Sequence, residues 1–277
     1  MKLIAILIAL ALEKWGGQLR PRRLIHGLSG WLTALVQRLG SRADGGVGVF
    51  LVLAFPVLLF ASIDLALSTL FEPLAILFAA VVLFACLGGH CLKESVEALA
   101  DMLERGDEEG ARIQASEITG RQVAEQGEAL VRVASEGLLV EANERVYGVL
   151  FWFILLGPAG AVLYRLSGSL QRVIDEDGCG LVQAANRFHW LLGWAPARLS
   201  ALGYAMAGSF GHATEHWSAH WHDMPDSNRA TLISSGLGAL LALEQGPPPQ
   251  LLAETLALVT RAVAVWAAAV ALIIIGS

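Results

Sequence analysis

The sequence predicts an all-α integral membrane protein, a polytopic helical bundle of four to six membrane segments with a cytoplasmic helical subdomain. Of its 277 residues, 55% are hydrophobic and only 16% are charged, whereas a soluble domain carries about 25% charged residues. Three stretches contain no Asp, Glu, Lys or Arg: residues 45–63, 73–92 and 146–164. Uncharged apolar runs of about 18 or more residues are typical of transmembrane helices.

The distribution of charge predicts the orientation of the chain. Residues 13–45 hold six basic and two acidic residues, a net charge of +4, and residues 93–145 hold six basic and thirteen acidic residues, a net charge of -7. Because loops rich in arginine usually face the cytoplasm, we expect both segments on that side. The overall net charge of -6 argues against nucleic-acid binding, which favours a basic surface.

The first part of the chain holds three apolar elements. Residues 1–12 resemble the apolar core of a signal peptide without a cleavage site after it, so we expect an uncleaved helix. At about 18 Å it is shorter than the roughly 30 Å bilayer core, which makes it a candidate fifth span. Segment 47–71, with Pro56 and Asp64 inside it, is the first full span, and segment 73–92 is predicted to return through the bilayer.

Residues 93–145 are polar and have the apolar spacing of helices. Three helices are predicted there. The second has Asp107 as its N-cap and ends near Ile118, and the third covers about residues 122–143. We treat the segment as a cytoplasmic subdomain within a single membrane domain of residues 1–277.

Three further apolar segments follow. Segment 146–166 is predicted to be a membrane span that Gly157 and Pro158 interrupt. Segment 188–211 is a candidate sixth span, and segment 257–277 is the last predicted span.

A histidine-rich segment is the one pattern that resembles a metal site. The spacing of His212, Glu215 and His216 matches a short zinc-protease pattern. Tryptophans lie among these histidines, as is typical of a helix at a membrane interface, so we favour that interpretation and expect no metal. No nucleotide-binding motif occurs, no cofactor is expected, and the sequence identifies no catalytic residue.

A second polar cluster lies where the predicted cytoplasmic helices meet the membrane. Carboxylates and arginines at such a junction can bind a phosphorylated or cationic ligand, although a charge cluster that only anchors a helix is the alternative. The predicted ligand-binding residues are Thr119, Gly120, Arg121, Glu136, Asn143, Glu144, Arg145 and Tyr147.

The same region resembles the CobD/CbiB superfamily. The resemblance rests on an ordered set of motifs: TGR at 119–121, NERVYGVLFW at 143–152, GPAGAVLYR at 157–165 and LGWAPARL at 192–199. One branch of that superfamily is a cobalamin-pathway synthase that amidates adenosylcobyric acid with an aminopropanol. Its aspartates are replaced here by Gln122 and Tyr147, and its proline by Trp152, whereas Phe151 and Trp152 resemble the other branch, AmpE.

The resemblance therefore implies an AmpE-like signalling or sensor protein of the bacterial inner membrane, and it disfavours an enzyme. Such a protein is expected to modulate β-lactamase induction, peptidoglycan recycling and antibiotic resistance. Its expected partners are the lipid bilayer, a small polar or cell-wall-derived ligand and a protein of the β-lactamase regulatory system, but no nucleic acid. Two alternatives stay open: a membrane-bound cobalamin-pathway amide synthase, and a transporter in which Asp64, Arg198 and Arg261 are pathway charges.

Overall fold

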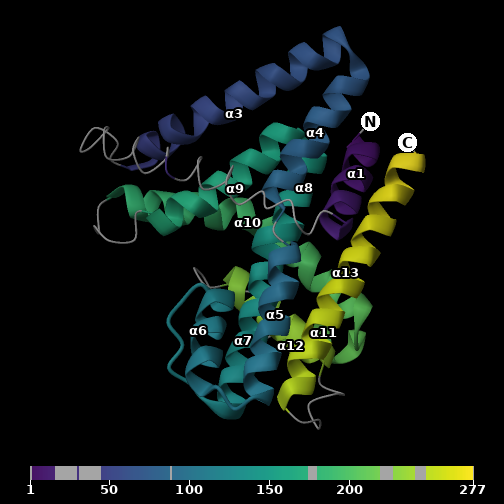
Figure 1. The fold of residues 1–277 in the computed structure, drawn as a ribbon. Helices are drawn as coiled ribbons and strands as arrows, with labels where there is room; N and C mark the ends of the chain where they lie inside the picture. Colours follow the sequence, from purple (N-terminus) through teal and green to yellow (C-terminus); the bar gives the residue numbers. More distant parts are fainter. Residues whose placement is uncertain are drawn as a thin grey trace. The chain divides into compact units, whose positions relative to one another are not determined.

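Helices form almost all of the described chain, as the apolar and periodic segments predict. The computed structural model describes residues 2–15, 30, 45–87, 89–173, 180–218, 227–240 and 248–276, and no strand occurs in these ranges. Two units make up the chain (Figure 1): unit 1 comprises Met1–Gly88 and Glu144–Trp194, and unit 2 comprises Gly89–Asn143 and Ala195–Ser277. Most of the predicted cytoplasmic segment 13–45 lies outside the described residues.

Unit 1 is built from apolar helices that pack through small and aromatic side chains. Its elements are α1 (Lys2–Trp15), α3 (Gly45–Leu70), α4 (Glu72–Cys86), α8 (Gly148–Leu156), α9 (Pro158–Val173) and the first part of α10 (Gly180–Ala207). Helix α1 packs on α4, α3 packs on α4 and α9, and α8 packs on α9. The predicted helix at residues 1–12 is confirmed, and its Ala5 and Ala9 are fully buried.

Segment 146–166 holds two helices, α8 and α9, which confirms the predicted interruption at Gly157 and Pro158. The break falls at Gly157, whose φ of 66° and ψ of -151° form a conformation open to glycine alone. Pro158 then begins α9, at a helix position where its missing N–H costs nothing. Segment 73–92 is also divided, because α4 ends at Cys86 and α5 begins at Gly89.

Two helices are long and apolar enough to cross a membrane in the described part of the chain. They are Gly45–Leu70, with a mean hydropathy of 2.5, and Gln250–Leu272, with a mean hydropathy of 1.9. These helices agree with the predicted spans 47–71 and 257–277. Lys2–Leu12 and Glu72–Cys86 are shorter apolar helices. The structure therefore supports a membrane protein, but helix length identifies two membrane spans in the described residues and not the four to six predicted.

Unit 2 is a bundle around α7. Its elements are α5 (Gly89–Glu104), α6 (Glu108–Thr119), α7 (Gly127–Ala142), the rest of α10, α11 (Phe210–Ser218), α12 (Ser227–Leu240) and α13 (Pro248–Gly276). Figure 1 shows α13 running beside α5 and α7, and α6 and α12 also pack on α7. The apolar face of α7 buries Leu130, Ala134 and Leu138 completely.

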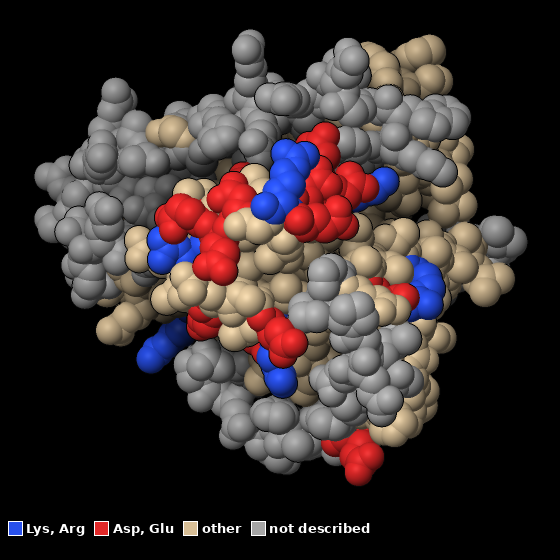
Figure 2. Space-filling model, turned by 60° about the horizontal axis from the view of Figure 1, so that its bottom comes forward, with Lys and Arg blue, Asp and Glu red and all other residues tan. Residues whose placement is uncertain are grey.

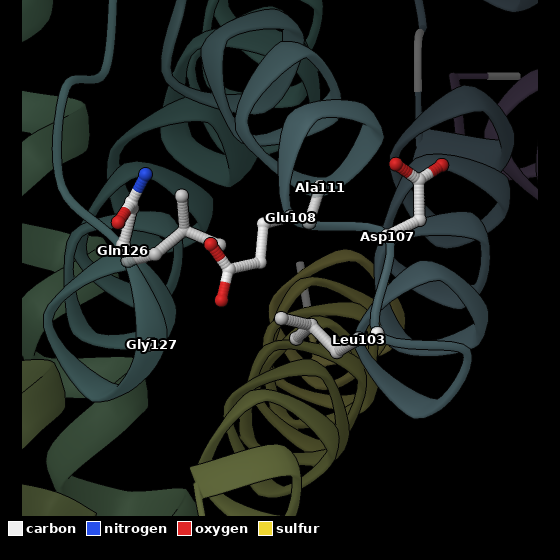
Figure 3. A pocket seen from close by; sticks show the side chains of 8 residues that line it. Leu103, Asp107, Glu108, Ala111, Gln126 and Gly127 are labelled. Atoms are coloured by element: carbon white, nitrogen blue, oxygen red, sulfur yellow. The ribbon is translucent and has the colours of Figure 1, made fainter.

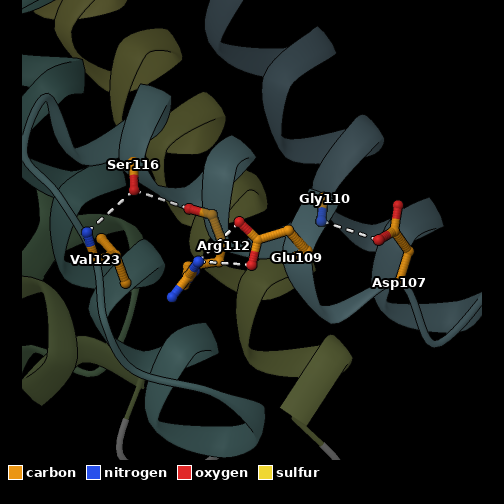
Figure 4. A network of polar contacts seen from close by, with 6 residues as sticks. All are labelled: Asp107, Glu109, Gly110, Arg112, Ser116 and Val123. Carbon is orange, nitrogen blue, oxygen red and sulfur yellow. Dashed lines mark hydrogen bonds and ion pairs between the residues drawn. The ribbon is translucent and has the colours of Figure 1, made fainter.

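Polar contacts set both ends of α6 (Figure 4). The Asp107 carboxylate accepts a hydrogen bond of 2.9 Å from the Gly110 amide, which confirms the predicted N-cap. Past the other end, the Val123 amide donates to Ser116 Oγ at 3.0 Å. Because this bond holds the connection against α6 in a non-helical form, α7 begins at Gly127 and not near residue 122 as predicted.

Candidate functional site

A π-helix carries four of the predicted ligand-binding residues. It is η2 (Asn143–Tyr147), which lies between α7 and α8. Single turns of π-helix often occur at functional sites, since the wider turn changes where its side chains point. The boundary between the two units falls inside η2, so Asn143 belongs to unit 2 and the other residues belong to unit 1.

Glu144 is the first member of a chain of hydrogen bonds inside unit 1. Its Oε2 lies 2.8 Å from Nε2 of His189 on α10, and Nδ1 of the same imidazole lies 2.8 Å from Oγ of Ser167 on α9. Ser167 is 1% exposed, while the side chains of His189 and Glu144 are 10% and 26% exposed. Glu144 is therefore the end of the chain that solvent or a substrate can reach.

The hydrogen bonds restrict where the protons of this chain lie. The Ser167 hydroxyl donates to the Tyr164 carbonyl at 2.8 Å. In that orientation the Ser167 oxygen accepts a hydrogen bond from Nδ1–H of His189. A second proton must then lie between His189 Nε2 and the Glu144 carboxylate to make their hydrogen bond. If the hydroxyl turns to donate to Nδ1, a neutral ring donates Nε2–H to the Glu144 carboxylate. The two arrangements differ by one proton, and the second gives up the hydrogen bond from Ser167 to the Tyr164 carbonyl.

Close packing holds the imidazole in place. The ring of Tyr164 lies 5.2 Å from the His189 ring, centroid to centroid, at an angle of 35°. A Cβ at Gly148 would lie 2.2 Å from the Tyr164 ring, and a Cβ at Gly168 would lie 3.2 Å from Cε1 of His189. Glycine at both positions therefore lets α8 and α9 approach these rings.

This geometry fits proton transfer better than nucleophilic catalysis. Ser167 is fully buried and bonded within its own helix, so it supports the imidazole and cannot reach a substrate. A carboxylate paired with an imidazole can accept a proton from a reacting group, and such general base catalysis contributes about 10² to 10⁴ in rate.

Most of the predicted residues of unit 2 have structural roles. Thr119 is buried at the end of α6 and donates to the Arg121 carbonyl at 3.0 Å. Gly120 ends the helix with a φ of 67°. Glu136 lies 3.6 Å from Arg132 in a solvent-facing pair. Arg121, in contrast, is exposed and open to a ligand.

The residues of η2 differ sharply in their surroundings. Asn143 is 1% exposed and accepts a hydrogen bond of 3.0 Å from Ser200 within unit 2. Tyr147 is fully buried in unit 1, and Arg145 is half-buried. Among these four, Glu144 is the residue that the structure joins to His189 and Ser167.

His189, Ser167 and Tyr164 were not among the site residues predicted from the sequence. One signal was available for His189, because it is a titratable residue near the start of the apolar segment 188–211, and such residues often mark functional sites. Its pairing with Glu144, 45 residues earlier in the chain, had no signal in the spacing of residues.

The histidine-rich segment offers no metal centre in the part of the chain that the structure describes. His212 Nδ1 lies 2.9 Å from Ser209 Oγ, and Glu215 is exposed on α11. The side chain of His216 lies outside the described residues. Within the described ranges, no three His, Cys, Asp or Glu side chains are grouped closely enough to hold a metal ion.

Unit 2 also has a small surface cavity of about 170 Å³ (Figure 3). It is lined by Leu103, Gly106, Asp107, Glu108, Ala111, Gln126, Gly127 and Leu130. In Figure 3 the Glu108 carboxylate extends toward the side that Gln126 lines, whereas Asp107 points away from the cavity. The predicted ligand-binding residues do not line it.

Figure 2 shows acidic side chains gathered on one face with fewer basic ones. Helices α5 and α6 carry many exposed carboxylates, among them Glu97, Asp101, Glu104, Glu109 and Glu117.

Comparison with known proteins identifies relatives over most of the chain. The family model described as CobD/Cbib protein matches residues 2–244. The cobalamin biosynthesis protein CobD of Chromobacterium violaceum is 33% identical over 207 residues, which cover 72% of this chain and 64% of the relative. CobD of Stutzerimonas stutzeri is 33% identical over 164 residues, 58% of this chain and 54% of the relative.

A more distant relative matches over a longer stretch: CobD of Dehalococcoides mccartyi is 25% identical over 235 residues, 80% of this chain and 76% of the relative. The chain thus spans less than two thirds of the first two relatives. No solved structure matches. Because these curated relatives carry the CobD name, the predicted AmpE-like role in signalling, β-lactamase regulation, peptidoglycan recycling and antibiotic resistance is wrong.

Proposed function

We propose, because this chain belongs to the CobD/Cbib protein family, that it acts in cobalamin biosynthesis as a membrane-bound amide synthase of the adenosylcobinamide-phosphate synthase type. The observation that carries this proposal is the 33% identity over 207 residues to a cobalamin biosynthesis protein CobD. The matched region includes the segments that hold Glu144 and His189, since the family model extends over residues 2–244.

The proposed location is the bacterial inner membrane, which the chain crosses several times. The long apolar helices Gly45–Leu70 and Gln250–Leu272 support this location, and the shorter apolar helices Lys2–Leu12 and Glu72–Cys86 would add further segments. We place segments 13–45 and 93–145 in the cytoplasm, where the exposed carboxylates of α5 and α6 meet water.

The Glu144–His189 pair is proposed to act on the amine substrate. An alkylammonium group has no lone pair, so it must lose a proton before its nitrogen attacks the carboxyl carbon of an acyl phosphate, which a nucleoside triphosphate supplies by phosphorylating the carboxylate. As the C–N bond of the amide forms, the C–O bond to the phosphate breaks and inorganic phosphate leaves. The Glu144 carboxylate is the accessible end of the hydrogen-bond chain and carries the charge that attracts an ammonium group. It accepts the ammonium proton, and His189 shares that proton across the 2.8 Å contact.

The half-buried Arg145, which follows Glu144 in unit 1, is proposed to bind a phosphate group of a substrate, for which a guanidinium group is suited. The aspartates of the synthase branch are replaced here by Gln122 and Tyr147. For this reason we assign the acid–base role to Glu144 and His189 and not to those two positions.

Complementation tests the proposed function. A bacterium that lacks its own CobD should regain cobalamin-dependent growth on supplied cobyric acid when it expresses this chain. Growth on cobinamide, which lies beyond the amidation step, is the control that the rest of the pathway works. If CobD of Chromobacterium violaceum restores growth on cobyric acid and this chain does not, the proposed function is wrong.

The role of the pair is tested in the same cells and in isolated membranes. Glu144→Gln and His189→Gln should each lower the rate of amide formation by about 100-fold, because each removes a proton acceptor. Glu128→Gln is the matched control, since Glu128 is exposed on α7 and should keep the wild-type rate. Wild-type rates in both site variants would assign the chemistry to other residues.

A further inference from the structure

Helix α10 contains a proline where a regular helix needs a donor. Pro196 lies inside this 28-residue helix. Proline has no N–H, and its ring pushes against the carbonyl group four residues earlier. In α10 that carbonyl belongs to Leu192, which therefore lacks the amide donor four residues on that a regular helix supplies.

A side chain from another helix donates to this carbonyl. Nε1 of Trp152, on α8, lies 3.0 Å from the Leu192 oxygen. Leu192 is 7% exposed, so water has little access to it, and a buried carbonyl without a partner is strongly destabilising. The indole N–H thus takes the place of the amide that Pro196 lacks.

The same turn of α10 carries His189, three residues before Leu192. Residues three apart lie on the same side of a helix, one above the other. His189 already bonds to Glu144 and to Ser167. A third bond, from Trp152 to Leu192, fixes the backbone of this turn within unit 1.

The backbone that carries Trp152 is itself firmly held. A Cβ at Gly160 would lie 2.1 Å from the Trp152 carbonyl oxygen, so α9 lies directly against α8 at this point. Phe151 packs edge-on against the indole ring, with 5.5 Å between the ring centroids. The indole donor is therefore presented from a rigid part of the unit.

We propose that Trp152 is a positioning residue for His189. Its indole N–H replaces the backbone donor that Pro196 removes, and it holds the turn of α10 where the imidazole reaches both Glu144 and Ser167. This inference concerns contacts of unit 1 and the course of α10, the helix that continues through Pro196, and it does not rest on the reaction proposed above.

Four proteins test the proposal: the wild type, Trp152→Phe, Pro196→Ala and the double variant. Each is labelled with ¹⁵N-histidine and reconstituted in lipid, and the His189 resonances are assigned by their absence from His189→Gln. Trp152→Phe should shift and broaden these resonances, because the imidazole loses its fixed place. In the Pro196→Ala background the new amide bonds to Leu192, so Trp152→Phe should leave the His189 resonances unchanged.

Unfolding measurements on the same proteins give a second readout. Trp152→Phe should raise the unfolding constant about tenfold beside Pro196 and less than about twofold beside alanine. Trp266→Phe is the matched control: its indole donates to the Leu199 carbonyl at 3.3 Å, and the residue four positions on is Gly203, which has an amide. Its effect should be equal in both backgrounds.

Two results would overturn the proposal: wild-type His189 resonances in Trp152→Phe, or an equal effect of Trp152→Phe with proline and with alanine at position 196. If Trp152→Phe does not fold alone, recovery of folded protein in the double variant supports the proposal. Failure of the double variant to fold, when Pro196→Ala folds, contradicts it.

Discussion

At the scale of single residues, the absence of a side chain at Gly148 decides where the Tyr164 ring lies. A Cβ at this position would lie 2.2 Å from Cε1 and 2.3 Å from Cζ of that ring. The ring is fully buried and packs on His189, so it has no free space into which it can retreat. The imidazole of the candidate site thus depends on a glycine that carries no chemistry.

Gly148→Ala should therefore destabilise the protein by about 1–3 kcal/mol, the usual cost of overpacking a tight core. The free energy of unfolding in detergent measures this change. Gly211→Ala is the control, because Gly211 is exposed and a Cβ there meets no atom within 4 Å. Equal stability of Gly148→Ala and the wild type would mean that the ring can move at little cost.

At the scale of elements, α6 depends on contacts at its two ends. Its first turn is capped by the Asp107 carboxylate and carries Glu108 and Glu109. Their negative charges interact favourably with the positive N-terminal end of the helix dipole. Arg112 lies 2.6 Å from Glu109, and Ser116 holds the following connection through the Val123 amide. These contacts determine where α6 begins and where α7 can begin.

Asp107→Ala should lower the local stability of α6 by about 1 kcal/mol, because the Gly110 amide loses its acceptor. Hydrogen exchange of the α6 amides in the folded protein measures this loss, and exchange should be faster in the variant. Asp101→Ala is the control, since Asp101 forms an exposed pair with Arg105 at 3.6 Å, and such pairs contribute little. Unchanged exchange in Asp107→Ala would show that the cap is dispensable.

At the scale of the whole molecule, large apolar side chains stand exposed along α3. Val47, Phe50, Leu58 and Leu65 are each at least 67% exposed. A water-soluble protein rarely leaves so many neighbouring apolar side chains uncovered, whereas lipid covers them without cost. The carboxylates exposed on α5 and α6 require water, so the two kinds of surface belong in different surroundings.

Cysteine labelling tests this separation. In a variant with Cys86, Cys91 and Cys179 replaced by alanine, cysteine is placed at Leu58 or at Glu128. A membrane-impermeant maleimide should label position 128 in inverted inner-membrane vesicles but not in intact spheroplasts, and it should label position 58 in neither. Both positions should react after denaturation in SDS. Labelling of position 128 from the outside would contradict a cytoplasmic segment 93–145.

The sequence alone determined features that depend on neighbouring residues in the chain. Composition predicted a helical membrane protein, because uncharged apolar stretches belong in lipid wherever the rest of the chain lies. Asp107 was predicted as an N-cap, because capping involves an amide only three residues away. The superfamily was also recognisable from ordered motifs. The branch inferred from Gln122, Tyr147 and Trp152 was wrong, because that inference gave three substituted positions more weight than the similarity to CobD along the rest of the chain.

Only the tertiary structure decided which polar residues meet. It joined Glu144 to His189, 45 residues away, and His189 to Ser167, 22 residues away. It also supplied Trp152 as the donor for a carbonyl that Pro196 leaves open. Local sequence patterns cannot predict such pairs, because a hydrogen bond between distant side chains forms only when helix packing brings both atoms within about 3 Å.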